Sequence, residues 1–392
     1  MNWPLVEIKK VARIVGGATP KSGVSEYWGG QIAWATPKDL ADLDGKEIVD
    51  TPRKITDRGL QSCAAEQLPA GSVLFSSRAP IGHIAINCAP MATNQGFKSF
   101  VPGPNLDASF LYWWLDANRE QLQAMGNGAT FKEVSKAVVE RIVLPLPPLP
   151  EQRRIAAILD QADTLRRLRR QTLSRLSDLG RAIFFEMFGD AATNPQDWPI
   201  VKLGDVCGVG SSKRVFVSEF TESGVPFYRG TEVGQLGAGK TISPELFIDR
   251  DHYESLIRES GRPAVGDLLL PSICHDGRIW LVDDDLPFYF KDGRVLWIKS
   301  AQANIDGEYL RRHLQDLFLR DYNKIASGTT FAELKIVNLK GLQILYPPLA
   351  LQKQFARRMS SLEGARKNML NATDKSEALF NSLQHRAFRG EL

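Results

Sequence analysis

The sequence predicts an α/β (α+β) protein in which two mixed α/β domains are joined by two long helices. Three observations lead there: a near-duplication of the chain, two long helical seams behind proline-rich segments, and short β-rich runs between turn residues. They predict a pseudo-two-fold internal repeat whose helices form an antiparallel coiled coil. The predicted domains are residues 1–150 and 197–347, and the predicted helices are residues 151–190 and 351–392.

The duplication shows in short matched blocks. Trp3-Pro4-Leu5-Val6 returns as Trp198-Pro199-Ile200-Val201 at an offset of 195, and Pro147-Pro148-Leu149 returns as Pro347-Pro348-Leu349 at an offset of 200. The second half therefore contains a net five additional residues. Two matched halves with divergent middles indicate one architecture that serves two ligands, or two halves of one ligand. Further matches are Gly71 with Gly266, Gly82 with Gly277, Phe131 with Phe331, Gln152 with Gln352 and Phe188 with Phe388.

Each predicted helix carries an apolar seam. From Ile155 to Met187, apolar residues recur in steps of three and four, and the second copy runs from Leu351 to Phe388. Both begin behind prolines, which exclude a helix upstream. Two such helices most simply pack on each other. Their remaining faces are solvated or form a platform for a partner, for which we consider Arg166, Arg167, Arg169 and Arg170.

The two globular parts have a different pattern, with short strands and long loops. Residues 110–125 and 308–325 are predicted helices. A mixed α/β unit with a twisted sheet is expected, and its loops are where recognition residues tend to lie. The predicted strands are 72–76, 83–87, 267–270, 278–282 and 294–299.

Composition excludes several classes of protein. The 392 residues are 43% hydrophobic and 24% charged, enough for two or more cores, and the net charge of +4 permits a polyanionic partner without requiring one. The absence of a signal pattern and of long apolar runs predicts a cytoplasmic protein with no membrane contact. The four cysteines are widely separated and form no CxxC pair, so we expect them to be reduced and predict no metal site. They are Cys63, Cys88, Cys207 and Cys274.

A resemblance to a known family rests on several blocks. Gly128-Ala129-Thr130-Phe131-Lys132, followed by the proline-rich run and helix start at residues 144–156, resembles the specificity subunits of type I restriction-modification systems. Residues 34–40, 76–82 and 94–97 match the same family. In the second half, Arg78 aligns with Ile273, Pro80 with His275, Glu151 with Leu351, and Asn94-Gln95-Gly96 with Lys291-Asp292-Gly293.

This resemblance implies a non-catalytic reader of double-stranded DNA. Each globular part would be a target-recognition domain that binds one half of a split, asymmetric site. The helices would space these domains and dock two modification subunits, which would bind S-adenosylmethionine and methylate adenine. Restriction subunits would add ATP-driven cleavage where the system includes them. Two unlike readers on a rigid spacer would set two unlike half-sites about 10 bp apart. No cofactor is expected in this chain itself.

Motifs for catalysis are missing from the sequence. The five histidines do not cluster with acidic residues, and neither GxSxG nor HExxH occurs. Asn194-Pro195-Gln196-Asp197 is not the Asn/Asp-Pro-Pro-aromatic element that the resemblance leads one to expect in an adenine methyltransferase. No catalytic residue is therefore predicted. A specificity subunit of a related type II system and an independent DNA-binding or scaffold protein remain as alternatives.

One motif favours a different function. Gly234 to Thr241 fits the phosphate-loop pattern GxxxxGK[ST], and Ile279 to Asp283 resembles an apolar strand that ends in a metal-binding aspartate. A phosphate loop, however, needs a buried strand before it and a helix after it. Pro244 disfavours a helix that starts at Lys240. We therefore expect a glycine-rich surface loop that offers Lys240 to a DNA phosphate, with a P-loop nucleotide site as the alternative.

Basic residues in both globular parts are the candidate DNA contacts. Arginine can bond bidentately to guanine, whereas lysine mostly contacts phosphate. In the first part the candidates are Lys38, Arg53, Lys54, Arg78, Lys98 and Lys132, and in the second they are Lys213, Arg214, Arg229, Lys240, Arg278, Arg294 and Lys335.

Overall fold

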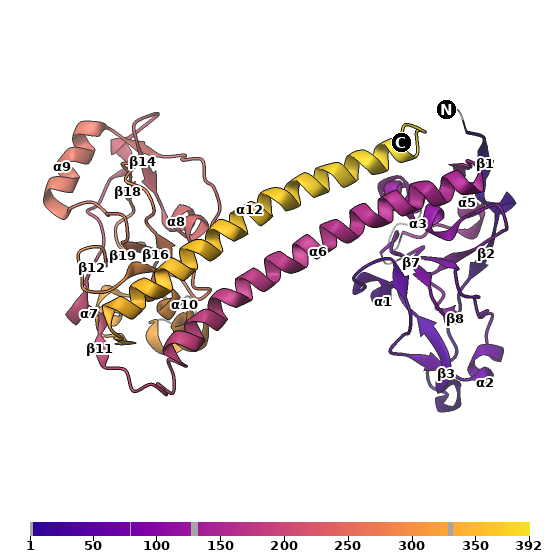
Figure 1. Cartoon of the computed structure of the whole chain (residues 1–392), viewed down its shortest axis with the longest axis horizontal. Coiled ribbons are helices and arrows are strands. Elements are labelled where there is room, and N and C mark those ends of the chain that lie inside the picture. Colours follow the sequence, from indigo (N-terminus) through magenta and orange to yellow (C-terminus); the bar gives the residue numbers. More distant parts are fainter. Residues whose placement is uncertain (1–2, 79, 127–131, 328–331) are drawn as a thin grey trace. The chain divides into compact units, whose positions relative to one another are not determined.

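The computed structural model describes residues 3–78, 80–126, 132–327 and 332–392, which form two compact units. The first unit comprises residues 1–171 and 371–392, and the second comprises residues 172–370. The long helices α6 (Leu149–Phe188) and α12 (Leu349–Ala387) each contribute to both units (Figure 1). The matched phenylalanines Phe131 and Phe331 lie outside the described residues.

The first unit is built on a five-stranded sheet of order β2-β9-β6-β7-β4, a three-stranded sheet β5-β3-β8 and the pair β1-β10. Its strands are β1 (Leu5–Glu7), β2 (Ala12–Gly16), β3 (Trp28–Ala35), β4 (Glu47–Ile48), β5 (Lys54–Ile55), β6 (Val73–Phe75), β7 (Ile84–Asn87), β8 (Met91–Thr93), β9 (Lys98–Pro102) and β10 (Val143–Pro145). Its helices are α1 (Pro37–Ala41), α2 (Asp57–Gln61), α3 (Ala108–Ala117), α4 (Arg119–Ala124) and α5 (Lys136–Glu140), with short 3-10 turns at Ile8–Lys10 and Ser25–Tyr27.

The second unit repeats this plan with a four-stranded sheet β12-β19-β16-β17, a four-stranded sheet β13-β15-β14-β18 and the pair β11-β20. Its strands are β11 (Ile200–Lys202), β12 (Gly208–Gly210), β13 (Phe220–Thr221), β14 (Val225–Tyr228), β15 (Phe247–Ile248), β16 (Leu268–Pro271), β17 (Trp280–Leu281), β18 (Tyr289–Phe290), β19 (Val295–Lys299) and β20 (Gln343–Leu345). Its helices are α7 (Leu203–Val206), α8 (Gly230–Gly237), α9 (Arg250–Ser260), α10 (Gly307–Ile325) and α11 (Ile336–Lys340), with a 3-10 turn at Val217–Glu219.

The matched glycines have a conformational cause. Gly71 and Gly266 have φ of 82° and 98°, and Gly82 and Gly277 have φ of 98° and 67°. Side chains rarely adopt this left-handed backbone, so glycine is favoured at both turns of both units. The same two turns precede β6 and β7 in the first unit and β16 and β17 in the second, which confirms the internal repeat.

The matched glutamines hold each long helix to its unit. Gln152 and Gln352 are fully buried, and each accepts a hydrogen bond from a backbone N–H, that of Asp107 or Asp306, at 2.8 Å. Each also donates to the carbonyl of the matched proline, Pro147 at 2.8 Å or Pro347 at 2.7 Å. Asp107 and Asp306 in turn cap helices α3 and α10. The glutamine therefore joins two helix starts and the proline-rich turn in one buried network.

Both units take core residues from both long helices. In the first unit, Ile155 and Leu159 of α6 share a buried cluster with Phe380 and Ala387 of α12. In the second unit, Phe184 and Phe188 of α6 share a cluster with Phe355 and Met359 of α12. The beginning of one helix thus meets the end of the other, which confirms the antiparallel pairing of their seams (Figure 1).

The arginines considered as a partner platform are engaged inside the first unit. Arg166 and Arg167 both pair with the buried carboxylate of Asp163, at 2.7 and 2.8 Å. Arg166 also lies over the ring of Phe380 in α12 at 3.7 Å. Arg170 pairs with Glu377, and Arg169 donates to the carbonyl of Ala372 at 2.6 Å. Their first role is to hold α12 against α6, and partner docking through them stays a prediction.

The prediction of one continuous helix over residues 110–125 is wrong, because the structure has two helices there. It divides into α3 and α4 at Asn118, whose φ of −105° and ψ of 16° leave the helical region. The Asn118 side-chain amide donates to the carbonyl of Trp114 at 2.7 Å, so the side chain satisfies a carbonyl at the end of the helix. The corresponding helix of the second unit, α10, continues without a break.

A buried histidine in α10 makes the second unit sensitive to acid. His313 is 2% exposed, and its Nδ1 has no hydrogen-bond partner among the described residues. Burial, and to a lesser degree the charge of Arg320, lowers the pKa of His313 to about 4 from its ordinary 6.5. Because the folded pKa is the lower one, stability is complete above pH 6.5 and is lost as the pH falls towards 4.

We expect acidification from pH 7 to pH 5 to cost the second unit about 2 kcal/mol through His313 alone. Urea unfolding at both pH values measures this loss, and His313→Phe should remove most of it. His275→Phe, at an exposed position of the same unit, serves as the matched control. An equal loss in the wild type and in His313→Phe would assign the acid sensitivity to other groups.

Candidate nucleic-acid interface

Four chain segments of the first unit meet in one group of loops, here called the loop cluster: residues 17–19, 35–38, 77–78 and 94–97. The N–H of Asn94 donates to the carbonyl of Ala35 at 3.0 Å, and the N–H of Ser77 donates to the carbonyl of Gly96 at 2.7 Å. The N–H of Ala18 donates to the carbonyl of Thr93 at 3.0 Å. Three of these segments belong to the blocks that carry the family resemblance, and the fold brings them together.

The loop cluster is closely packed around Gly17. A Cβ on Gly17 would overlap the carbonyl oxygens of Asn94 and Thr93, whereas a Cβ on the preceding Gly16 would meet nothing within 4 Å. The indole Nε1 of Trp34 donates to the carbonyl of Ala18 at 3.0 Å and so fixes the first segment to β3. The cluster therefore has little freedom to rearrange.

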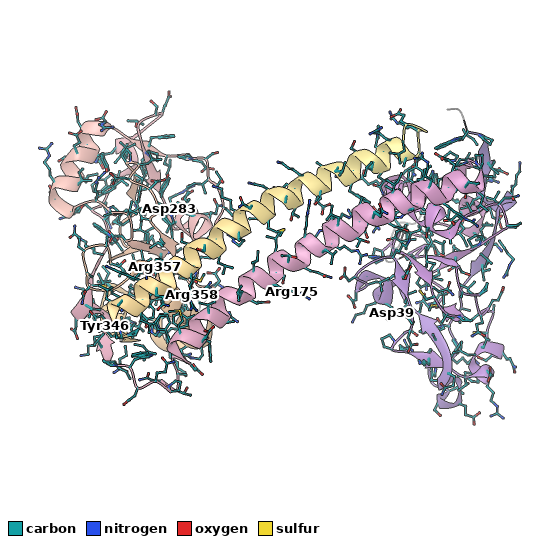
Figure 2. All side chains as sticks on the ribbon, in the orientation of Figure 1. Asp39, Arg175, Asp283, Tyr346, Arg357 and Arg358 are labelled. Atoms are coloured by element: carbon teal, nitrogen blue, oxygen red, sulfur yellow. The ribbon has the colours of Figure 1, made fainter. Side chains whose placement is uncertain are left out.

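The basic candidates of the first unit lie around this cluster and differ in their exposure and in their contacts. Lys38 is exposed on α1. The start of this helix is fixed because Asp39, which is labelled in Figure 2, accepts from both the N–H and the hydroxyl of Thr36 at 2.7 Å. The guanidinium of Arg53 lies 4.4 Å from the ring centre of Trp28 and 4.7 Å from that of Trp34, a cation–π arrangement that orders it.

The remaining candidates of the first unit differ in how far they are already paired. Arg78 is half-buried, and its backbone bridges to Glu133 beside the cluster. Lys98 pairs with the side chain of Glu133 at 3.2 Å and Lys54 pairs with Asp50 at 3.0 Å. Lys132 is exposed. The geometry thus groups Lys38, Arg78 and Lys98 most closely around the cluster.

The second unit keeps the same framework of loops. The N–H of Lys291 donates to the carbonyl of Tyr228 at 2.9 Å, as Asn94 does to Ala35, and the N–H of Ser272 donates to the carbonyl of Arg294 at 2.9 Å, as Ser77 does to Gly96. A third bond matches as well. The N–H of Leu334 donates to the carbonyl of Ser272 at 2.7 Å, as that of Val134 does to the carbonyl of Ser77 at 2.9 Å.

This framework corrects the alignment of one loop. The N–H of Phe97 bonds to the carbonyl of Asn94 three residues earlier, whereas the N–H of Val295 bonds to that of Lys291 four residues earlier. The second loop is therefore one residue longer, and Gly96 corresponds in its hydrogen bond to Arg294 instead of Gly293. Arg294 pairs with Glu333, the counterpart of Glu133. A basic side chain thus stands where the first unit has a glycine.

Most of the other second-unit candidates already have acidic partners. Arg229 pairs with the buried Glu232 and with Glu245, and these carboxylates raise its pKa. Glu232 also accepts from the N–H of Arg229 at 2.8 Å, as Asp39 does from Thr36. Lys335 precedes α11, and Lys240 is exposed. The remaining pairs are Lys213 with Glu259 at 3.7 Å, Arg214 with Asp292 at 3.1 Å and Arg278 with Asp276 at 2.5 Å.

The phosphate-loop alternative does not fit the fold. Gly234 and Gly237 lie inside and at the end of helix α8, so a helix, not a buried strand, precedes Lys240. Residues 241–246 after it form no helix. The backbone amides are therefore not arranged to cradle a phosphate. Asp283 accepts a hydrogen bond from the indole of Trp280 at 3.4 Å instead of facing such a loop.

Sequence reasoning missed several side chains around the loop cluster. The hydroxyl of Thr19 bonds to the side chain of Gln95 and links two segments of the cluster. The two tryptophans below Arg53 stand at right angles, with ring centres 5.1 Å apart. Even spacing places side chains on one face only in a regular strand. β3 has a register shift between Trp28 and Ile32, so the sequence spacing alone did not signal this pair.

Other classes of site are not found in the part of the chain that the structure describes. No group of three or more histidine, cysteine, aspartate or glutamate side chains could hold a metal ion there. No helix among the described residues has the length and apolar character needed to cross a bilayer. All four cysteines are free thiols, and burial raises the pKa of Cys207 and Cys274 to about 12.

Comparisons with known proteins point the same way. A family model described as the type I restriction modification DNA specificity domain matches residues 1–177 and 195–378. The type I restriction enzyme MjaIX specificity subunit of Methanocaldococcus jannaschii is 28% identical over 379 residues, covering 90% of this chain and 85% of that protein. The MjaVIII specificity subunit of the same organism is 25% identical over 388 residues, covering 92% and 86%.

Solved structures share the fold across the whole chain. The crystal structure of a type I restriction-modification S subunit from M. genitalium covers 99% of this chain and 96% of its own, with a TM-score of 0.60 and 14% identity. A second structure, which concerns complex assembly and conformational transition of the type I R-M system, covers 100% and 98% with a TM-score of 0.60 and 19% identity.

Proposed function

Because the chain belongs to the type I restriction modification DNA specificity family, we propose that its two units read the two unlike halves of one asymmetric DNA site. The observation that carries the proposal is a shared loop framework with different residues in the same places. Gly96 and Arg294 accept the same backbone hydrogen bond, yet only one presents a side chain. Identical frameworks with unlike surfaces should select unlike sequences.

In this proposal the chain is a reader and its partners are the enzymes. Two modification subunits bind it, and S-adenosylmethionine belongs to them, as does the methylation of adenine. Restriction subunits join where the system encodes them. The proposal draws support from the family to which the chain belongs. The exposed apolar residues of the helices, such as Leu165, Leu179 and Leu379, supply docking area.

The reading residues of the first unit are those around the loop cluster: Lys38, Arg53, Arg78, Lys98 and Lys132 in our proposal, with Lys54 nearby. Lysine contacts to phosphate would set the register, and arginine contacts to base edges would specify the sequence. In the second unit the proposed reading residues are Arg294, Arg214 and Lys335, with Lys213, Arg229, Arg278 and Lys240 around them.

Selection of bound DNA from a random library tests the proposal directly. The purified complex of this chain with its modification subunits should enrich one motif with two specified segments and an unspecified spacer. Enrichment of a palindrome, or of no sequence at all, would contradict the proposed reading by two unlike units.

Arg78→Ala should weaken binding to the selected site by about 1 to 3 kcal/mol, or relax one base pair in one half-site. Quantitative binding to the selected site and to single-base variants measures both effects. Arg58→Ala is the matched control, because Arg58 is an exposed arginine of the same unit that pairs with Glu26 at 2.8 Å, away from the loop cluster. Unchanged affinity and sequence preference in Arg78→Ala would remove it from the interface.

A further inference from the structure

Among the described residues, the main sheet of the second unit has no counterpart of the edge strand β4 of the first unit. In the first unit, β4 pairs in parallel with β7 and forms one edge of a five-stranded sheet. In the second unit the corresponding sheet ends at β17, and the described residues supply no strand beyond it. The missing strand leaves an edge whose hydrogen-bonding groups need another partner.

The register of β17 shows which groups face outward. Val282 and Asn87 make the same pair of bonds: Val282 donates to Asp267 and accepts from Gly266, and Asn87 does the same with Ser72 and Gly71. Leu281 and Asp283 therefore correspond to Ile86 and Cys88, whose N–H groups donate outward to the carbonyls of Lys46 at 2.7 Å and Ile48 at 2.9 Å.

No strand among the described residues of the second unit bonds to these two outward groups. Among the described residues, none accepts a hydrogen bond from the N–H of Leu281 or of Asp283. Both residues line a cavity of about 1410 Å³ within this unit (Figure 2 labels Asp283). Leu286 and Phe288 line it too, and Leu286 is 70% exposed. The cavity thus combines strand-edge donors with an exposed leucine, whereas Phe288 beside it is already buried.

The strand that fills this place in the first unit has a recognisable chemistry. The Nζ of Lys46 pairs with Asp160 at 2.6 Å and bonds to the hydroxyl of Ser109 at 2.9 Å. Two residues later, Ile48 is 3% exposed in the core. The strand therefore needs a lysine for the helices and, two positions on, an apolar β-branched residue for the core.

The second unit carries the same chemistry beside its cavity. Lys240 and Ile242 have the spacing of Lys46 and Ile48, and both line the cavity, with Lys240 exposed. Glu308 and Ser360 stand where the first unit has Ser109 and Asp160, since the buried glutamine networks of both units align these helices. Glu308 also lines the cavity, and its carboxylate pairs with Arg311 at 2.7 Å, so the lysine would share this carboxylate with Arg311.

We propose that the cavity is a strand-acceptor site and that Lys240-Thr241-Ile242 docks into it parallel to β17. The carbonyls of Lys240 and Ile242 accept from the N–H groups of Leu281 and Asp283. Ile242 covers the exposed Leu286, and the Nζ of Lys240 joins Arg311 at the carboxylate of Glu308. Lys240 and Thr241, which end the phosphate-loop pattern, then stabilise the fold. Lys240 contacts a DNA phosphate only when this segment is undocked, so the docking is a role separate from the reading of bases.

Hydrogen exchange at single-amide level tests the docking in the full chain, alone and with its modification subunit. The amides of Leu281 and Asp283 should exchange at least tenfold more slowly in the wild type than in Ile242→Asp. Val217→Asp, at a side chain 85% exposed in the same unit, should leave both rates unchanged. The β19 amides report folding and should stay equally protected in all three proteins.

Two results would overturn the proposal. Fast exchange of both amides in the wild type, equal to that in Ile242→Asp, would show that no strand docks there. Protection that appears only with the modification subunit and survives Ile242→Asp would show that a partner's strand fills the site instead. Neither result bears on whether the chain reads a split DNA site, so failure of the docking and failure of the proposed function are distinguishable.

Discussion

Gln152→Leu is expected to lower the free energy of unfolding of the first unit by about 2 to 5 kcal/mol. The Gln152 side chain accepts from the N–H of Asp107 at 2.8 Å and donates to the carbonyls of Asn105 at 2.9 Å and Pro147 at 2.8 Å. Leucine has a similar size but removes the partner of three backbone groups, of which only the carbonyl of Pro147 lies in a fully buried hydrogen bond. Each group left unsatisfied in the interior costs about 1 to 3 kcal/mol. Water reaching one of the carbonyls would place the loss at the lower end.

Urea unfolding followed through hydrogen exchange of the α3 amides measures this loss within the first unit. Gln161→Leu supplies the matched control, since Gln161 is an exposed glutamine on the same helix. The control should change stability by less than about 0.5 kcal/mol. A loss in Gln152→Leu no larger than in the control would mean that the buried network does not hold α6 to the unit.

Gly17→Ala is expected to abolish sequence preference in one half of the DNA site and to leave the other half intact. The added Cβ overlaps the carbonyl oxygens of Asn94 and Thr93, so the loop cluster must shift at its base. Overpacking of this kind costs about 1 to 3 kcal/mol, and the rigid contacts between segments give the cluster no cheap way to relax. The expected loss covers every base read by the first unit, unlike the single base expected for Arg78→Ala.

Gly16→Ala provides a stringent comparison, because it adds the same methyl group one residue earlier, where nothing lies within 4 Å. Selection of bound DNA by each variant complex gives the two motifs. If Gly17→Ala and Gly16→Ala select the same full motif as the wild type, the loop cluster is not the reading surface of the first unit.

The architecture could be predicted because its signals are local or periodic. The seams of α6 and α12 follow from apolar spacing, and the prolines before them fix where both helices begin. The glycines repeated at 195 residues follow from backbone conformation, since both pairs lie in left-handed turns. The paired glutamines were visible as a repeat, although their buried hydrogen bonds were not.

The details of the site depend on contacts between distant segments, which a sequence does not display. α3 ends at Asn118, whose side chain donates a hydrogen bond to the carbonyl of Trp114. Helix periodicity in the sequence does not reveal this end. The loop before Val295 is one residue longer than its counterpart in the first unit, but nothing in the sequence marks the position of the added residue. Arg229 reads as a free cation until the fold places Glu232 and Glu245 beside it. That no described strand pairs with the outer edge of β17 likewise appears only in the sheet order.

The central claim is that two unlike units of one chain direct modification to a split DNA site. Expression of this chain with its modification subunit in a methylation-free host, followed by a genome-wide map of modified bases, tests it most directly. The account predicts N6-methyladenine on both strands of a single asymmetric motif with two specified segments and a fixed spacer. A verified, stable complex that adds no methylation, or that modifies adenines without a split motif, would contradict it.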